Sequence, residues 1–181
     1  LSPNTLVGMM AAKYRPPVTA YALPVQHLAS LSQIERERRR LLRDPEVRKI
    51  YEAAQNVDIA LVGIGFIGEG TPGFCSLAEA YGVSVKTLRR LGVVGEVNYQ
   101  AFDAGGKVVD RPELRPLSRR MLSVTAERLQ ALSRADAKYV IGVAGGRPKI
   151  GAIRAALHGR FLNVLITDED TALALVGSRQ A

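Results

Sequence analysis

The sequence has little of the chemistry that cysteine, histidine and tryptophan supply. Its 181 residues include one cysteine, two histidines and no tryptophan. A lone thiol excludes an internal disulfide, and we expect Cys75 to be packed rather than reactive. His27 and His158 have no serine or cysteine partner at a recognisable spacing, so neither a hydrolytic triad nor a structural zinc site is indicated. We therefore predict no metal.

Long apolar runs are also absent. No stretch reaches the roughly 18 residues that a membrane-spanning helix requires. The first ten residues lack the charged start and the sustained apolar core of a signal peptide. We therefore expect a cytoplasmic protein with no membrane association. The length, with 47% hydrophobic residues, is typical of one globular domain.

Charge is plentiful and unbalanced, with a formal net charge of +8. The densest run extends from Ile34 to Lys49 and interleaves glutamates with arginines. Glu35 stands one helical turn before Arg39, which is the spacing of an intrahelical ion pair. The run has leucines at helical spacing and no aromatic residue that could stack on a base. We interpret it as a solvated helix face, with nucleic-acid binding as the alternative.

Three nearly continuous apolar runs indicate the fold class. They are DIALVGIG, YVIGVAGG and FLNVLITD, at residues 58–65, 139–146 and 161–168. Such runs are typical of parallel strands that are covered on both faces. Helical patterns follow the second run over 149–158 and the third over 168–176. Strands joined by helices form βαβ units, so we predict an α/β, Rossmann-like parallel sheet with helices on both faces.

Local signals mark further elements. Ser2 or Asn4 can cap a helix over 2–14, and Asp44 before Pro45 marks the start of a helix through Asn56. Ser84 marks the start of another helix, and Thr167 or Asp168 can cap the helix after the third apolar run. A short strand from Val18 to Leu23 is predicted between prolines. A longer insert after the first apolar run is predicted to contain a strand over 93–103, a turn at 104–106 and a partner strand at 108–110.

Candidate binding residues follow all three apolar runs, because ligands of open α/β sheets bind beyond the carboxyl ends of the strands; the third run is followed by residues 167–170. Gly63 and Gly65 end the first run; Gly145 and Gly146 end the second, and Lys149 opens the next helix. Glycines let a ligand approach the backbone, and a helix start offers free N–H groups and partial positive charge. A lysine there is unfavourable for the helix itself, which favours a role toward an anion such as phosphate. The alternative is a plain strand-to-helix turn with a solvated lysine.

Two further patterns are less specific. GIGFIG at residues 63–68 matches the dinucleotide fingerprint only loosely, because the spacing to a helix start and a later acidic residue is wrong, so no cofactor is predicted. Glu96 and Asp103 lie seven residues apart on or beside one predicted strand. They could act as an acid and a base, or they could form a polar rim.

Taken in order, these segments resemble a known family. DIALVGIG, LGVVGEVNYQAFDAGGKVVD, VIGVAGGRPKIGAIRAAL and NVLITDEDTALAL are similar to the C-terminal, effector-binding domain of SorC-type bacterial transcriptional regulators, over most of residues 4–176. The resemblance implies a fold like that of sugar-phosphate isomerases. It also implies binding of a phosphorylated sugar or related metabolite, which changes the oligomer and its hold on operator DNA.

The resemblance also assigns roles to individual residues. Asp103, in the FD motif, would accept hydrogen bonds from sugar hydroxyls, and Lys149, in AGG-x-x-K, would pair with phosphate. Glu96 occupies a position that is commonly acidic in the family. The glycines that match are Gly63, Gly65, Gly145 and Gly146.

The sequence departs from the family before Leu1, where a helix-turn-helix and a first strand would stand. We therefore expect residues 1–181 to be a single effector-binding domain that is N-terminally incomplete, self-associates as a dimer or tetramer, and meets DNA only through that absent helix-turn-helix. The resemblance implies a regulator rather than an enzyme. The alternative is an isomerase-like enzyme in which Asp103 or Glu96 moves a proton while Lys149 holds phosphate.

Overall fold

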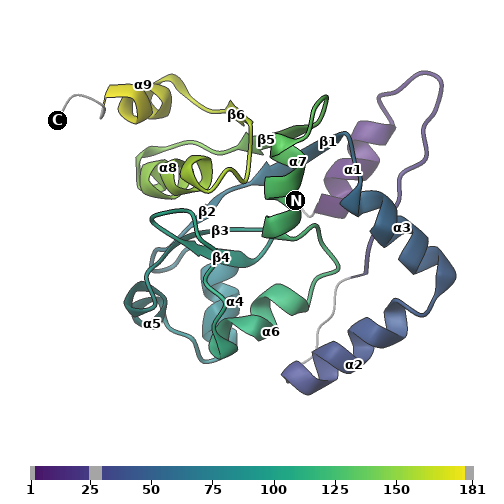
Figure 1. Ribbon diagram of the computed structural model, residues 1–181, viewed down its shortest axis with the longest axis horizontal. Helices are drawn as coiled ribbons and strands as arrows, with labels where there is room; N and C mark the ends of the chain where they lie inside the picture. Colours follow the sequence, from purple (N-terminus) through teal and green to yellow (C-terminus); the bar gives the residue numbers. More distant parts are fainter. Residues whose placement is uncertain (1–2, 25–29, 178–181) are drawn as a thin grey trace.

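The computed structural model describes residues 3–24 and 30–177, which form two three-stranded sheets (Figure 1). One sheet is parallel, in the order β1-β5-β6, and the other is antiparallel, in the order β2-β3-β4. The strands are β1 (Ile59–Gly63), β2 (Gly65–Phe66), β3 (Val93–Val97), β4 (Gln100–Asp103), β5 (Tyr139–Val143) and β6 (Val164–Ile166). The predicted α/β fold with a parallel sheet is confirmed.

Helices connect and cover the strands. They are α1 (Pro3–Ala11), α2 (Leu31–Leu41), α3 (Pro45–Gln55), α4 (Phe74–Ala80), α5 (Val85–Arg90), α6 (Arg115–Arg119), α7 (Ala126–Arg134), α8 (Ile150–His158) and α9 (Glu169–Gly177), with 3-10 turns η1 (Pro112–Leu114) and η2 (Arg147–Lys149). Asp44 caps α3 by accepting from the Glu46 N–H at 2.9 Å, and Ser84 caps α5. Both caps were predicted. The predicted cap Ser2 lies outside the described residues, and Asn4 lies within α1 rather than before it.

One face of the parallel sheet packs into the main core. Side chains from β1 and β5, including Val62 and Val140, meet α7 and α8 there. Helix α8 also contacts the antiparallel sheet and so joins the two sheets into one core. Phe102 and Phe161 are both fully buried at this junction, and the centroids of their rings lie 5.1 Å apart. Cys75 is 1% exposed in a second apolar cluster, as predicted for a packed thiol.

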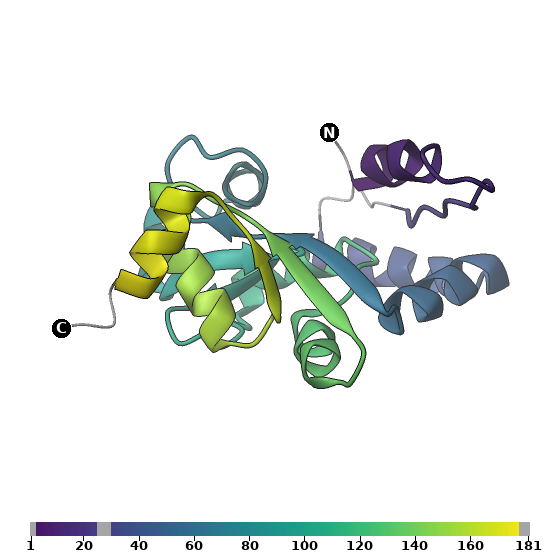
Figure 2. The same cartoon turned by 90° about the horizontal axis from the view of Figure 1, so that it is seen from above.

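The other face of the parallel sheet is largely uncovered, whereas helices on both faces were expected. Helix α7 covers one side of the sheet and leaves the other side without its cover (Figure 2). Burial alternates along β1, so its continuous apolar sequence does not correspond to continuous burial. The apolar side chains that remain 45–61% exposed are Ile59, Leu61, Tyr139, Val143 and Ile166. Coverage of this face by the described helices is therefore incomplete.

Three strand predictions are corrected. No strand forms over 18–23, because no described strand pairs with this extended, mostly exposed segment. The run 58–65 is divided at Ile64, so that β1 belongs to the parallel sheet and β2 to the antiparallel one. The predicted strand over 93–103 is the hairpin β3–β4, because Asn98 and Tyr99 form a turn with positive φ angles of 50° and 62°.

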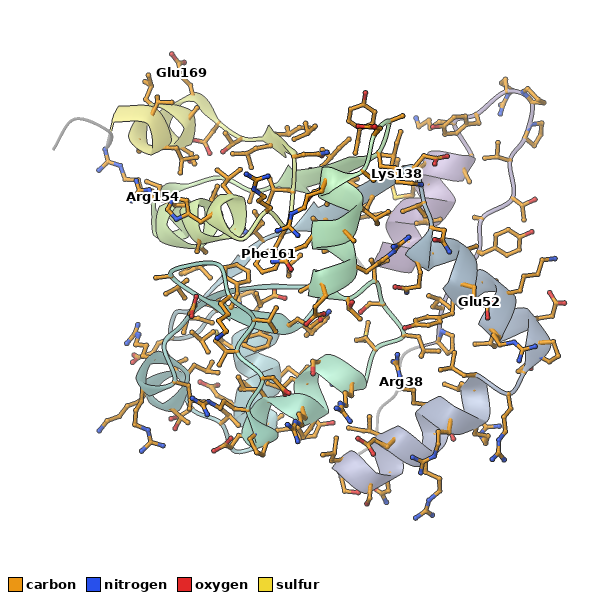
Figure 3. The ribbon with its side chains drawn as sticks, viewed as in Figure 1. Arg38, Glu52, Lys138, Arg154, Phe161 and Glu169 are labelled. Carbon is orange, nitrogen blue, oxygen red and sulfur yellow. The ribbon has the colours of Figure 1, made fainter. Side chains whose placement is uncertain are left out.

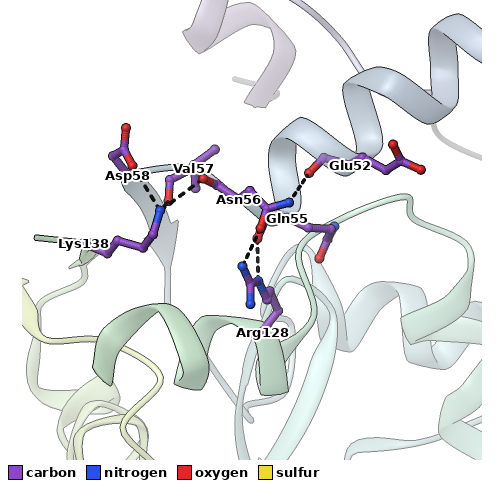
Figure 4. Close-up of polar contacts among 7 residues, drawn as sticks. All are labelled: Glu52, Gln55, Asn56, Val57, Asp58, Arg128 and Lys138. Atoms are coloured by element: carbon purple, nitrogen blue, oxygen red, sulfur yellow. Dashed lines mark hydrogen bonds and ion pairs between the residues drawn. The ribbon is translucent and has the colours of Figure 1, made fainter. Parts of the chain in front are cut away.

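Helices α2 and α3 form an arm attached mainly by polar contacts (Figure 4). Of the side chains described in these two helices, only Ile34 is buried. Arg128 donates to the Asn56 side chain at 2.7 Å, and Lys138 donates to the carbonyls of Asn56 and Val57 at 3.2 Å each. These cations satisfy carbonyls at the end of α3, where positive charge is favoured. We call residues 31–55 the α2–α3 arm.

Candidate functional site at the strand ends

The carboxyl ends of β1 and β5 lie side by side. Gly63 pairs in register with Val143, so the glycine turn that follows β5 begins next to the end of β1. This is the edge at which an open α/β sheet holds its ligands. The structure thus places Gly63, Gly145 and Gly146 at one location, as predicted from the apolar runs.

Glu96 joins this edge from the antiparallel sheet. Gly65 on β2 is paired with Glu96 on β3, and a Cβ at Gly65 would collide with the Glu96 carboxylate. The close approach explains why this position holds glycine. The second carboxylate oxygen, Oε2, accepts from the backbone N–H of Tyr99 at 2.8 Å.

The electrostatics place Lys149 within reach of Glu96. Burial raises the pKa of the Glu96 carboxyl above its ordinary value, whereas the Tyr99 N–H and the positive charge of Lys149 act to lower it. The charge of a half-buried lysine therefore acts on a mostly buried carboxylate at this edge of the sheet, without an ion pair between the two. Together they offer a cation for an anionic group and an acceptor for hydroxyl groups.

Residues that follow the neighbouring strand, β6, hold the glycine turn that precedes Lys149. The Gly146 N–H donates to Asp168 Oδ2 at 2.9 Å and to Thr171 Oγ1 at 2.8 Å. Gly145 lies so close to the Asp168 carboxylate that a Cβ would collide with it. The Thr171 N–H is the main cause that lowers the pKa of Asp168, and the Thr171 hydroxyl and the Gly146 N–H add to it. Asp168 was predicted as a helix cap and as part of the third strand end, and it positions this glycine turn.

Lys149 ends η2, immediately before α8. Among the described residues, no side chain caps the start of η2 or of α8, so the first N–H groups there have no side-chain acceptor. The N–H groups of Lys149 and Ile150 donate to the Gly146 and Arg147 carbonyls, so it is Lys149, at the positive start of α8, that offers a site for an anion such as phosphate. The phosphate-binding role of AGG-x-x-K stays a prediction.

Asp103 is not brought to the same place. Its Oδ1 accepts from the N–H groups of Gly105 and Lys107 at 3.0 and 2.9 Å, which closes the turn after β4. The turn packs against the end of α8, where Gly106 meets Gly159. Lys149 precedes the start of the same nine-residue helix, about 13 Å away along its axis.

A cavity of about 490 Å³ lies elsewhere, between α2, β4 and α6. It is lined by residues that include Arg38, Tyr99, Gln100, Leu114, Ser118 and Met121, and by none of the predicted site residues. Tyr99 links this cavity to the strand ends, because its N–H donates to Glu96. Within the described residues no cluster of His, Cys, Asp and Glu could hold a metal ion, and no helix is long and apolar enough to cross a membrane.

A parallel α/β sheet whose strand ends carry glycine turns, a lysine and a carboxylate has the architecture of a small-molecule binding domain. The chain matches the family model described as "Putative sugar-binding domain" over residues 1–177 and belongs to that family.

Relatives of the chain are transcriptional regulators. It is 31% identical over 180 residues to the erythritol catabolism regulatory protein EryD of Brucella abortus (strain 2308), covering 97% of this chain and 51% of EryD. It is 33% identical over 133 residues to the transcriptional regulator LsrR of Escherichia coli (strain K12), covering 73% of this chain and 39% of LsrR. The chain thus spans about half the length, or less, of these curated relatives.

Solved structures agree with this assignment. The full-length sorbitol operon regulator SorC from Klebsiella pneumoniae superposes with a TM-score of 0.73 at 26% identity, covering 96% of this chain and 51% of that one. The probable sor operon regulator from Shigella flexneri gives 0.72 at 28% identity, covering 96% and 61%. The predicted SorC-type resemblance is confirmed, and these likenesses favour a regulator domain over an isomerase.

Proposed function

We propose that this domain binds a phosphorylated sugar or a related anionic metabolite at the ends of β1 and β5, and that occupancy controls DNA binding by a cytoplasmic regulator. The observation that carries the proposal is that Lys149 follows the Gly145–Gly146 turn at the end of β5 and exerts its charge on Glu96. The family and the regulator names of the relatives support it. The domain would act without catalysis, and occupancy would alter its association into dimers or tetramers.

Each group has a distinct role in this proposal. Lys149, at the positive start of α8, would hold the phosphate, and the Glu96 carboxylate would accept from a sugar hydroxyl. Gly63 would leave space for the ring, whereas the space beside Gly65 is taken by the Glu96 carboxylate. Asp103 fits the role of closing its own turn rather than that of contacting the ligand, because it lies at the other end of α8.

The test is a thermal-shift titration with inorganic phosphate and a panel of sugars, each with and without a phosphate group. A ligand at about 100 times its Kd stabilises a protein by about 2.7 kcal/mol, which corresponds to roughly 5–10 °C for a domain of this size. We expect phosphorylated sugars to give such a shift and the shift to vanish in Lys149→Ala. Lys86→Ala is the matched control, because Lys86 is an exposed lysine on α5.

The same panel separates the alternatives. If Lys149→Ala binds phosphorylated sugars as tightly as the parent, the proposed site is refuted. Turnover of any sugar phosphate would refute the non-catalytic role. Asp103→Ala should lower the melting temperature yet keep the full ligand-induced shift. A selective loss of the sugar-phosphate shift in that variant would instead place Asp103 in the binding site.

A further inference from the structure

Helix α2 presents a row of arginines to solvent. Arg36, Arg39 and Arg40 lie on the helix, and Arg43 lies in the turn that continues it, with its N–H bonded to the Arg40 carbonyl at 3.1 Å. At 3.6 residues per turn these four positions fall within an arc of about 100°. All four are exposed. We call them the arginine stripe.

Most of the stripe is free of carboxylates. The sequence predicted an ion pair between Glu35 and Arg39, but Glu35 pairs with Arg119 of α6 instead. Glu37 pairs with Arg40 at 2.5 Å. None of the ion pairs found in the described part of the chain involves the other three arginines, Arg36, Arg39 and Arg43. The mixed run of acids and bases therefore folds into a face with three unpaired cations.

The opposite side of α2 is anchored, which fixes the direction of the stripe. Ile34 is fully buried, and Arg38 reaches inward to donate to the Met121 carbonyl and the Tyr51 hydroxyl, both at 3.0 Å (Figure 3). A reciprocal capping box between Ser30 and Gln33 orders the first turn. The arginines thus stand on a fixed helix, so little backbone entropy is lost when they bind.

We propose that the arginine stripe contacts the phosphate backbone of double-stranded DNA, independently of the effector site. The stripe extends about 10 Å, enough to meet about three phosphates along one strand. Arginine is well suited to phosphate because its guanidinium donates two parallel hydrogen bonds. The contact would add affinity without sequence preference and would hold the effector domain against the duplex.

Other polyanions fit the stripe less well. Single-stranded nucleic acid is held by aromatic side chains on which bases stack, and the stripe has none. Membrane-surface helices bury an apolar face in the lipid, whereas the inward side of α2 is packed against this protein through Ile34. Duplex DNA requires only regularly spaced cations.

The experiment is a fluorescence-anisotropy titration of a mixed-sequence 25-base-pair duplex with the chain at 50–200 mM salt. The stripe variant is Arg36→Ala/Arg39→Ala/Arg43→Ala. The control is Lys86→Ala/Arg89→Ala/Arg90→Ala, which removes three exposed charges from α5. Circular dichroism verifies that both variants fold.

Each phosphate contact contributes about −0.9 to the slope of log affinity against log salt. We expect the slope of the stripe variant to be smaller in magnitude by about 2.7. When the salt rises fourfold, from 50 to 200 mM, the affinity of the parent should therefore fall by a factor about 40 times larger than that of the variant. The control should keep the parent slope. Equal slopes in all three proteins, equal losses in both variants, or tighter binding to single-stranded RNA or anionic vesicles would each overturn the proposal.

Discussion

Replacing Gly65 by alanine should displace the Glu96 carboxylate. Gly65 faces Glu96 across the β2–β3 pair, and an added Cβ would occupy the space of that carboxylate. The strand backbone at Gly65 has no positive φ and accepts alanine without strain. The Glu96 side chain is the flexible partner and must move, which breaks its 2.8 Å hydrogen bond with the Tyr99 N–H.

The magnitude follows from that bond. A hydrogen bond to a charged group contributes about 1.5–3 kcal/mol. The alanine offsets roughly 0.5 kcal/mol of this loss, because glycine loses more backbone entropy than alanine on folding. We therefore expect Gly65→Ala to lower the free energy of unfolding by about 1–2.5 kcal/mol.

A double-mutant cycle in urea isolates the cause. Its four proteins are the parent, Gly65→Ala, Glu96→Ala and the double variant. In the Glu96→Ala background the added methyl group has space, so Gly65→Ala should cost nothing or stabilise slightly. An equal cost in both backgrounds would show that the collision with Glu96 is not what the alanine changes, and the reasoning would be refuted.

Three further predictions concern the pH response, the core and a helix cap. Burial raises the pKa of Glu96 in the folded protein, so the contribution of Glu96 to stability is complete below the ordinary carboxyl pKa and is lost as pH rises through the folded pKa. The stability of the parent relative to Glu96→Gln should therefore fall with rising pH. A rise would contradict the burial effect. Phe161→Ala should lower the free energy of unfolding by about 3–5 kcal/mol, measured by urea denaturation, because the buried ring packs on Phe102; a cost below 1 kcal/mol would mean that this contact is not part of the core. Asp44→Ala should cost about 1 kcal/mol through the lost cap of α3, and an unchanged urea midpoint would refute that role.

Features set by short stretches of sequence were the most predictable. The apolar run at 139–146 indicated β5, and the strand-end rule placed Gly145, Gly146 and Lys149 correctly beside the end of β1. Asp44 before Pro45 marked the start of α3 because a capping oxygen and a fixed φ act within one turn.

Features that depend on distant partners were not predictable. Glu35 has Arg39 at helical spacing, yet it pairs with Arg119, which is 84 residues away. Segment 18–23 has strand-forming residues but no partner strand in the described chain. The contact between Asp168 and Gly146 joins two loops that only the assembled sheet brings together.

Other misses had a local signal. Asn98 tolerates positive φ and is the first residue of the turn between β3 and β4, so it could have divided the predicted strand over 93–103. Helix α7 follows Thr125, whose side chain accepts from the Arg128 N–H at 3.2 Å, as a capping residue should. The signal at Asn98 was masked by neighbouring apolar residues that favour one longer strand.

The attachment of the α2–α3 arm has a consequence for how the protein opens. The arm contributes one buried side chain, and it is also held to the rest of the protein by polar contacts, such as the Arg38–Met121 and Arg128–Gln55 hydrogen bonds and the Glu35–Arg119 ion pair. Detaching it exposes little apolar surface, so its opening free energy should lie well below that of global unfolding. Amide hydrogens of α2 and α3 should therefore exchange with solvent as one unit, ahead of those in β5 and α8. A partner held by the arm would slow that exchange first.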